Sequence, residues 1–196
     1  MIWLASKSPR RKEILDQMGV LFKTIDVEVD ESVLSRESGT NYVERVALAK
    51  AKAGWEKVEQ SSDILISADT SVLLGERILG KPEDIDDARE TLKKLSGKTH
   101  MVCTVVCAMT EGKVNLARST SKVTFQKIST EMREAYLETR ESLGKAGSYA
   151  IQGRAAQFIS HIEGSYSGIV GLPIYETSRL LRQMVATSGK DVDGLD

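Results

Sequence analysis

The 196-residue sequence predicts an α/β protein. Segments with helical apolar spacing alternate with short apolar segments of strand character along the whole chain. Residues 63–74 form a nearly continuous apolar run, which is typical of a strand covered on both faces. The chain contains no internal repeat, and no linker divides it into independent units. We therefore expect a single domain over residues 1–196.

The expected elements follow from apolar spacing and from residues that start or stop helices. In the first expected helix, Ile14, Leu15 and Met18 share one face. Ser8-Pro9 before them is a start signal, and Gly19 after them is a stop signal. In chain order we expect a strand at residues 1–6, this helix, a strand at 22–29, a helix at 40–58, a strand at 63–74, turns at Gly75, Gly80 and Pro82, a helix at 84–95, strands at 99–110 and 114–126 joined in a hairpin at Glu111-Gly112, a helix at 130–140, a glycine-rich loop at 144–153, a strand at 158–162, a second such loop at 168–173 and a helix at 174–187.

The first and last segments of the chain differ in character. Residues 1–6 are apolar but lack the basic leader and cleavage site of a secretion signal, so they indicate a first buried strand. Leu180, Leu181 and Met184 give the last helix its apolar face. The tail after Ser188 is polar, and we expect it to fray.

Composition excludes several classes of protein. With 27 Lys and Arg against 28 Asp and Glu, the net charge is -1, so the chain has no general basic field for nucleic acid. Only ten aromatic residues are present to stack bases. No stretch approaches the roughly 20 apolar residues of a membrane span. The cytoplasm is therefore the expected compartment, and any polyanion site must be local.

The cysteines, the histidines and one short motif resemble functional sites but lack other residues that such sites need. Cys103 and Cys107 are even-spaced on one strand face with no further ligand nearby, which favours buried free thiols over a metal or redox pair. Residues 96–99 read Ser-Gly-Lys-Thr, but a helix precedes them and the earlier glycine of a P-loop is missing. His100 and His161 have no nucleophile motif beside them and are interpreted as core or surface residues.

A basic segment follows the first strand. Ser8 is suited to cap the helix and Pro9 to its first position, which places Arg10 and Arg11 in the first turn. Cations there oppose the helix dipole unless an anion occupies the site. Free backbone N–H groups, the Ser6 hydroxyl and two guanidinium groups would then form a phosphate cradle. The alternative is an exposed basic patch or a modification site.

Acidic residues supply the second candidate feature. Asp69 is expected at the carboxyl end of a buried strand, where α/β proteins place ligand sites. An unpaired buried acid costs several kcal/mol, so Asp69 should contact a metal ion or another cation. Glu28, Asp30 and Glu31 are candidate partners, and such oxygen ligands suit Mg²⁺ or Mn²⁺. Each acid taken singly is more typical of a surface charge or a member of an ion pair.

Two further residues lie beside glycines. Lys81 stands between Gly80 and Pro82, where a tight turn would fix the direction of its amine. Gln152, in the glycine-rich loop, offers one donor and one acceptor group. An ordinary turn lysine and a structural amide are the respective alternatives.

Several of these residues fall in blocks that resemble the Maf family. The blocks, which occur in family order, are Leu4-Ala5-Ser6-Lys7-Ser8-Pro9-Arg10-Arg11, Tyr42-Val43-Glu44-Arg45-Val46-Ala47 through Lys50-Ala51, Ala68-Asp69-Thr70, Leu79-Gly80-Lys81-Pro82, Leu95-Ser96-Gly97-Lys98-Thr99-His100, Lys145-Ala146-Gly147, Ile151-Gln152-Gly153 and Val170-Gly171-Leu172-Pro173. One block could arise by chance, whereas eight in register are specific.

The resemblance implies a fold and a reaction. The fold is a Maf-type, ITPase-like curved mixed sheet with flanking helices and two lobes around a deep cleft. The reaction is metal-dependent hydrolysis of a nucleoside triphosphate to the monophosphate and pyrophosphate, as in nucleotide-pool sanitation. A divalent cation, Mg²⁺ or Mn²⁺, is the implied cofactor, and a homodimer is the implied assembly.

The resemblance also assigns roles to residues of this chain. Asp69 would be the proton acceptor, and Glu31 would hold the metal, with Asp69 as a possible second ligand. The triphosphate contacts would be Ser6, Arg11, Lys50 and Lys81, and the residues that set substrate specificity would be Arg10, Thr70 and Gln152. A triphosphate carries about four negative charges, which several converging cations would offset.

These last three residues imply a pyrimidine substrate, dTTP or UTP, with CTP and modified pyrimidines as further options. The Gln152 amide matches the N–H donor and carbonyl acceptor of uracil or thymine. The sister branch that resembles 7-methyl-GTP pyrophosphatases carries Trp, Gln and Glu at the positions of Arg10, Thr70 and Gln152. Cleavage of 7-methyl-GTP is therefore one alternative function. A nucleotide-sensing regulator of cell division that acts through a partner is another.

Two positions depart from the family pattern. Gly144 stands where members usually carry Asp, which removes a charge near the cleft. Ser67 replaces a glycine before Ala68-Asp69 and should be tolerated within a strand.

Overall fold

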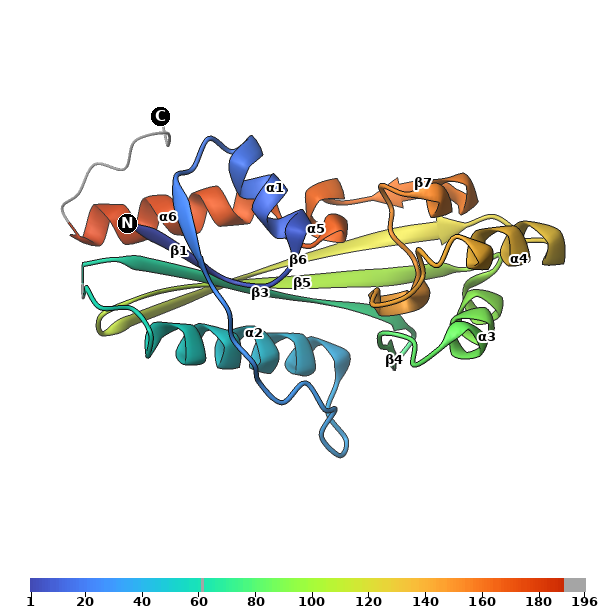
Figure 1. The fold of residues 1–196 in the computed structure, drawn as a ribbon, viewed down its shortest axis with the longest axis horizontal. Helices are drawn as coiled ribbons and strands as arrows, with labels where there is room; N and C mark the ends of the chain where they lie inside the picture. Colours follow the sequence, from blue (N-terminus) through green and yellow to red (C-terminus); the bar gives the residue numbers. More distant parts are fainter. Residues whose placement is uncertain (61, 189–196) are drawn as a thin grey trace.

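The computed structural model describes residues 1–60 and 62–188, so the expected frayed tail after Ser188 lies outside the described residues. The sheet and its helices form one elongated body (Figure 1). In chain order the elements are β1 (Ile2–Ala5), α1 (Pro9–Gln17), β2 (Phe22–Ile25), α2 (Gly39–Trp55), β3 (Ile64–Leu74), β4 (Arg77–Leu79), α3 (Ile85–Leu95), β5 (Thr99–Thr110), β6 (Lys113–Phe125), α4 (Thr130–Glu138), the short 3₁₀ helices η1 (Ala146–Ser148) and η2 (Arg154–Phe158), β7 (Ile159–Glu163), α5 (Tyr166–Val170) and α6 (Ile174–Ser188).

The strands form a seven-stranded mixed sheet in the order β2-β1-β3-β5-β6-β7, with β4 paired to β3. β1 runs parallel to both β2 and β3, and the other pairings are antiparallel. Three long strands, β3, β5 and β6, run through the body from end to end (Figure 1). This confirms the expected mixed α/β sheet with flanking helices.

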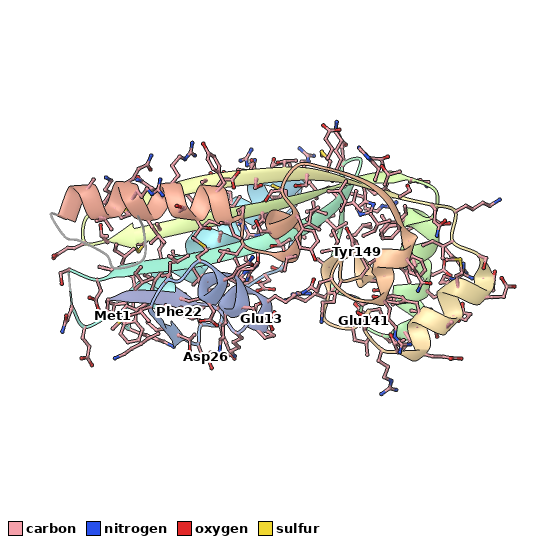
Figure 2. All side chains as sticks on the ribbon, turned by 90° about the horizontal axis from the view of Figure 1, so that it is seen from above. Met1, Glu13, Phe22, Asp26, Glu141 and Tyr149 are labelled. Carbon is pink, nitrogen blue, oxygen red and sulfur yellow. The ribbon has the colours of Figure 1, made fainter. Side chains whose placement is uncertain are left out.

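Helices cover the sheet in two groups. Near the N-terminus, α2 packs on one face, while α1 and α6 lie on the other (Figure 1). At the opposite end, α3, α4 and the 3₁₀ helices surround a second apolar cluster built around Phe125, Tyr136 and Phe158. In the view from above, Met1 and Phe22 mark the first group, and Glu141 and Tyr149 mark the second (Figure 2).

One edge of β3 is interrupted. Its first residues pair with β1, with Ala5 opposite Ser67, and its last residues pair with β4 from Val72 onward. Within the described residues, no strand pairs with residues 68–71 on this edge. Asp69 therefore lies inside β3, which corrects the expectation that it ends a strand. The strand that ends beside it is the shorter parallel neighbour β1.

Most other elements match their expected ranges, and the exceptions have physical causes. β2 ends at Ile25 rather than at residue 29, because its partner β1 is only four residues long. The turn expected at Gly75 is present, and an additional short strand, β4, follows it because Arg77–Leu79 pairs with the end of β3. α5 takes the start of the second glycine-rich loop, where Gly168 packs closely on Ser119.

The two cysteine side chains match their prediction. Cys103 and Cys107 are free and buried, and burial raises the pKa of the Cys107 thiol to about 12. Among residues 1–60 and 62–188, no helix combines the length and apolar character needed to cross a membrane.

His100 is a core residue. Its ring Nε2 lies 2.8 Å from the Tyr149 hydroxyl, and its ring meets Phe125 edge-on at a centroid distance of 5.0 Å. Burial lowers the pKa of His100 to about 4. His161, in contrast, is exposed on β7.

Acid should therefore destabilise the fold through His100. Between pH 6.5 and pH 4 the unfolded chain binds a proton at this position and the folded chain does not, so the free energy of unfolding falls by up to about 3 kcal/mol. The free energy of unfolding, measured with urea, should change less between pH 6.5 and pH 4 in His100→Gln than in the wild type. His161→Gln is the control and should retain the wild-type slope. Equal slopes for all three proteins would contradict the assignment.

Candidate functional site

A cleft of about 420 Å³ opens where the edge of β3 is unpaired. Its walls come from the β1–α1 junction, the segment after β2, α2, β3, the turn after β4 and the glycine-rich loop. The lining includes every residue that the sequence assigned to the site: Ser6, Arg10, Arg11, Glu31, Lys50, Asp69, Thr70, Lys81 and Gln152. Residues far apart in the sequence thus meet in one place, although their individual roles stay predictions.

Lys50 joins the two acids of the cleft. Its Nζ donates to Asp69 Oδ1 at 2.7 Å and lies 2.6 Å from Glu31 Oε1. The position of Lys50 is fixed because α2 packs tightly on β3, where the Ser67 hydroxyl donates to the Ala47 carbonyl at 2.7 Å. Ser67 is therefore well tolerated, as expected. The expected cation beside buried Asp69 is this lysine.

Glu31 also contacts Lys81, whose Nζ lies 2.9 Å from Glu31 Oε2. Burial disfavours the charged form of Glu31, but hydrogen bonds and charge from Lys50 and Lys81 outweigh it and lower the pKa of Glu31 to about 2. The segment that carries Glu31 is held by the Tyr42 hydroxyl, which donates to the Glu31 carbonyl at 3.0 Å. Glu31 is thus a fixed anion between two lysines.

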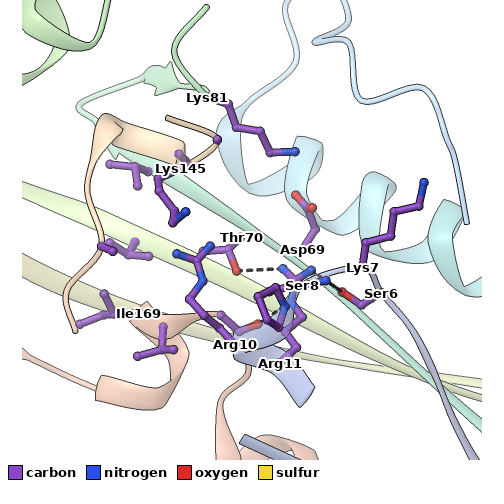
Figure 3. A pocket seen from close by; sticks show the side chains of 18 of the residues that line it. Ser6, Lys7, Ser8, Arg10, Arg11, Asp69, Thr70, Lys81, Lys145 and Ile169 are labelled. Atoms are coloured by element: carbon purple, nitrogen blue, oxygen red, sulfur yellow. Dashed lines mark hydrogen bonds between the residues drawn. The ribbon is translucent and has the colours of Figure 1, made fainter. Parts of the chain in front are cut away.

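Arg11 forms the floor beside this cluster. Its Nε donates to the Gly171 carbonyl at 2.8 Å, and its two terminal nitrogens donate to Ser6 Oγ and Thr70 Oγ1, each at 3.3 Å (Figure 3). Thr70 Oγ1 in turn lies 2.9 Å from Thr104 Oγ1. Burial lowers the pKa of Arg11, and the charge of Asp69 partly offsets this effect. The guanidinium group is therefore oriented before any ligand binds.

The start of α1 differs from expectation in one respect. Ser8 occupies the cap position and Pro9 follows it, as predicted, but the Ser8 side chain makes no capping hydrogen bond. Instead, the Ser8 backbone N–H donates to Ser6 Oγ at 3.2 Å. The first turn contains no acidic residue. A basic first turn without a side-chain cap is suited to an anion.

The acidic residues near the cleft differ in whether they could hold a metal ion. Glu28 pairs with Lys7 at the surface, and Asp30 accepts the Ser32 N–H, so these two candidate partners of Asp69 are wrong. Asp69 and Glu31 both direct an oxygen at the single ammonium of Lys50. The described residues contain no cluster of three or more protein ligands. Magnesium commonly uses one or two carboxylates together with phosphate oxygens, so this pair fits a metal that arrives with a phosphate ligand.

Two lysines in the cleft received no role from the sequence. Lys7 and Lys145 line the walls, and burial together with the charge of Arg10 lowers the pKa of Lys145. Lys145 lies in a predicted block beside Gly144, which has a φ of +68° and open space around it. The same loop reaches the Lys81 turn, because the Gly147 N–H donates to the Gly80 carbonyl at 3.1 Å.

The charge pattern defines a class of site. The cleft lining holds six basic side chains and two acidic ones, in a chain whose net charge is -1. Apolar residues, including Val72, Val102 and Ile169, line the same cleft. Cations beside an apolar wall suit a ligand with a polyphosphate and an uncharged ring system. An α/β fold with such a cleft has the features of a nucleotide-binding site.

Comparison with known proteins gives the family. The Maf-like protein family matches residues 1–184, and this chain belongs to it. A dTTP/UTP pyrophosphatase of Xanthomonas oryzae pv. oryzae is 48% identical over 184 residues, covering 92% of this chain and 97% of that protein. One of Pseudoalteromonas atlantica is 45% identical over 186 residues, covering 94% and 97%. The solved Staphylococcus aureus Ham1 protein aligns with a TM-score of 0.46 at 14% identity, covering 63% of this chain and 71% of that chain.

Glu31 should compete with an incoming polyanion for the two lysines. In Glu31→Gln the amide no longer neutralises Lys50 and Lys81, so tripolyphosphate should bind about tenfold more tightly in the absence of metal. Calorimetric titration with tripolyphosphate in chelator measures this change. Glu163→Gln, which removes an exposed acid paired with Lys122 outside the cleft, should bind as the wild type does. Unchanged or weaker binding in Glu31→Gln would show that the lysines are not the anion site.

Proposed function

We propose that this chain hydrolyses pyrimidine nucleoside triphosphates, dTTP and UTP foremost, to the monophosphate and pyrophosphate. The observation that carries the proposal is the convergence of Asp69, Glu31 and Lys50 within a cleft of six basic side chains. The names of the relatives support it, since proteins 44–48% identical over more than nine tenths of this chain are dTTP/UTP pyrophosphatases.

Asp69 is suited to accept a proton. Lys50 fixes Asp69 Oδ1, whereas Oδ2 accepts no hydrogen bond from the described residues. A water molecule beside Oδ2 would lose its proton to the carboxylate as it attacks the α-phosphorus. Because α2 and β3 are rigid elements packed together, the acid is held in place for this step.

The basic residues would bind the triphosphate. Arg11, oriented by three hydrogen bonds, presents a fixed charge beside Ser6. Lys50 and Lys81 would neutralise the leaving pyrophosphate once it displaces their acidic partners. We propose that Asp69 and Glu31 hold Mg²⁺ or Mn²⁺, which would supply charge compensation at the phosphates when bound. Binding of the nucleotide would then release both lysines from Glu31.

Base recognition is assigned to the glycine-rich loop. The Gln152 side chain is exposed on the cleft wall and forms no hydrogen bond within the described residues, so both of its amide groups are free for a pyrimidine edge. Thr70 is bound to Arg11, which supports an indirect effect on specificity through that arginine. A homodimer and a cytoplasmic location stay predictions.

The products distinguish this reaction from other phosphatase chemistry. UTP incubated with the protein and Mg²⁺ or Mn²⁺ should yield UMP and pyrophosphate, because the acid and the cations suit attack at the α-phosphorus. Ion-exchange chromatography of the nucleotide and separate assays of pyrophosphate and orthophosphate give the answer. UDP with orthophosphate would mean that the bond position is wrong, and no turnover of any nucleotide in a panel would remove the enzyme assignment.

Asp69→Asn should lower kcat by about 10² or more, because asparagine has nearly the same shape but cannot take a proton. Thermal melting should show that the variant folds. Asp63→Asn is the control: Asp63 is also buried but binds the N-terminal amine at 2.9 Å, outside the cleft, so its loss should lower stability and leave kcat unchanged. Wild-type turnover by Asp69→Asn would exclude Asp69 as the base.

A further inference from the structure

We propose that Glu141 is a positioning residue that sets the base selectivity of the cleft by holding the turn on which Gln152 stands. This inference rests on the proposed function, because it concerns the reading of a pyrimidine base. Glu141 follows α4 and does not line the cleft. Its influence would therefore act through the backbone on either side of Gln152.

The first observation is a paired hydrogen bond. The Arg154 N–H donates to both carboxylate oxygens of Glu141, at 3.0 Å each. Arg154 begins η2, and the first N–H groups of a helix lack partners within the helix itself. Hydrogen bonds to a charged acceptor are about twice as strong as neutral ones. The carboxylate thus fixes the chain two residues after Gln152.

The second observation is the close fit of Gly153 under the same carboxylate. A Cβ on Gly153 would overlap Glu141 Oε1, so only glycine allows this contact. The Gly153 N–H closes a turn by donating to the Ala150 carbonyl at 3.1 Å, which places Gln152 inside that turn. On the other side, Ile151 is buried in the apolar cluster at the α3–α4 end. Gln152 is therefore an exposed residue between two fixed neighbours.

Loss of Glu141 should release one side of this turn. The Gln152 amide would then sample several positions, and a pyrimidine would lose the matched donor and acceptor. Arg11 and Lys50, proposed to bind the phosphates, lie on other elements and would not move. Lys145 shares the loop but precedes Gly147, whose N–H is bound to the Gly80 carbonyl, so its position should also be kept. Loss of Glu141 should therefore reduce the discrimination between bases and leave the affinity for a polyphosphate without a base unchanged.

The test is a double-mutant cycle on kcat/KM for UTP relative to ATP. Glu141→Ala and Gln152→Ala should each reduce this ratio by about tenfold, and the double variant should lose no more than either single variant. Tripolyphosphate, titrated as a probe without a base, should bind Glu141→Ala as tightly as the wild type. Glu141→Gln, which keeps one acceptor oxygen, should recover most of the ratio. Glu138→Ala, an exposed glutamate on α4, is the matched control and should change nothing.

The remaining outcomes would contradict the inference, and they can be told apart. Additive losses in the double variant, or an equal loss of tripolyphosphate binding, would overturn the inference by showing a general structural role. Should Glu141→Ala not fold, Glu141→Asp carries the same cycle, because the shorter side chain draws the carboxylate away from Arg154. A wild type that cleaves UTP and ATP equally would overturn the proposed function and this inference together. A selective wild type whose preference persists in Glu141→Ala would overturn this inference alone.

Discussion

The interruption of pairing along one edge of β3 is the constraint on which the cleft depends. β1 stops at Ala5 and β4 begins to pair only at Val72, so the strand between them has an open edge. The open edge is tolerable because β5 pairs continuously along the other side. A buried strand that is well held on one edge and open on the other can present an acid to solvent without losing its own position.

Charge balance within the cleft follows from the same geometry. A buried carboxylate and a buried ammonium are each costly alone, and Lys50 reduces both costs by standing between Asp69 and Glu31. The cleft is thus internally neutralised on one side while Arg10, Arg11 and Lys145 leave a surplus of positive charge on the other. This division leaves both acids beside the lysines and an uncompensated positive charge on the Arg10 side of the cleft.

The sequence predicted the elements well and the site unevenly, for identifiable reasons. Pro9 and Gly19 mark α1 locally, so the basic first turn could be found from residue types alone. Lys50 could not be told from Lys52 by composition, because only the packing of α2 on β3 decides which lysine reaches Asp69. Glu31 was separable from its acidic neighbours only by resemblance. Glu141 gave no local signal, since its partner N–H lies thirteen residues later.

The bond between the Gly147 N–H and the Gly80 carbonyl has a mechanical consequence. It couples the turn that carries Lys81 to the loop that carries Gln152, and Gly147 also packs closely on Val72 of β3. Lys81 and Gln152, proposed to bind a phosphate and the base, thus lie on two segments of one cleft wall. A displacement of the Lys81 turn would be passed to the Gly147 end of the loop, whereas the Gln152 end is held separately by Glu141.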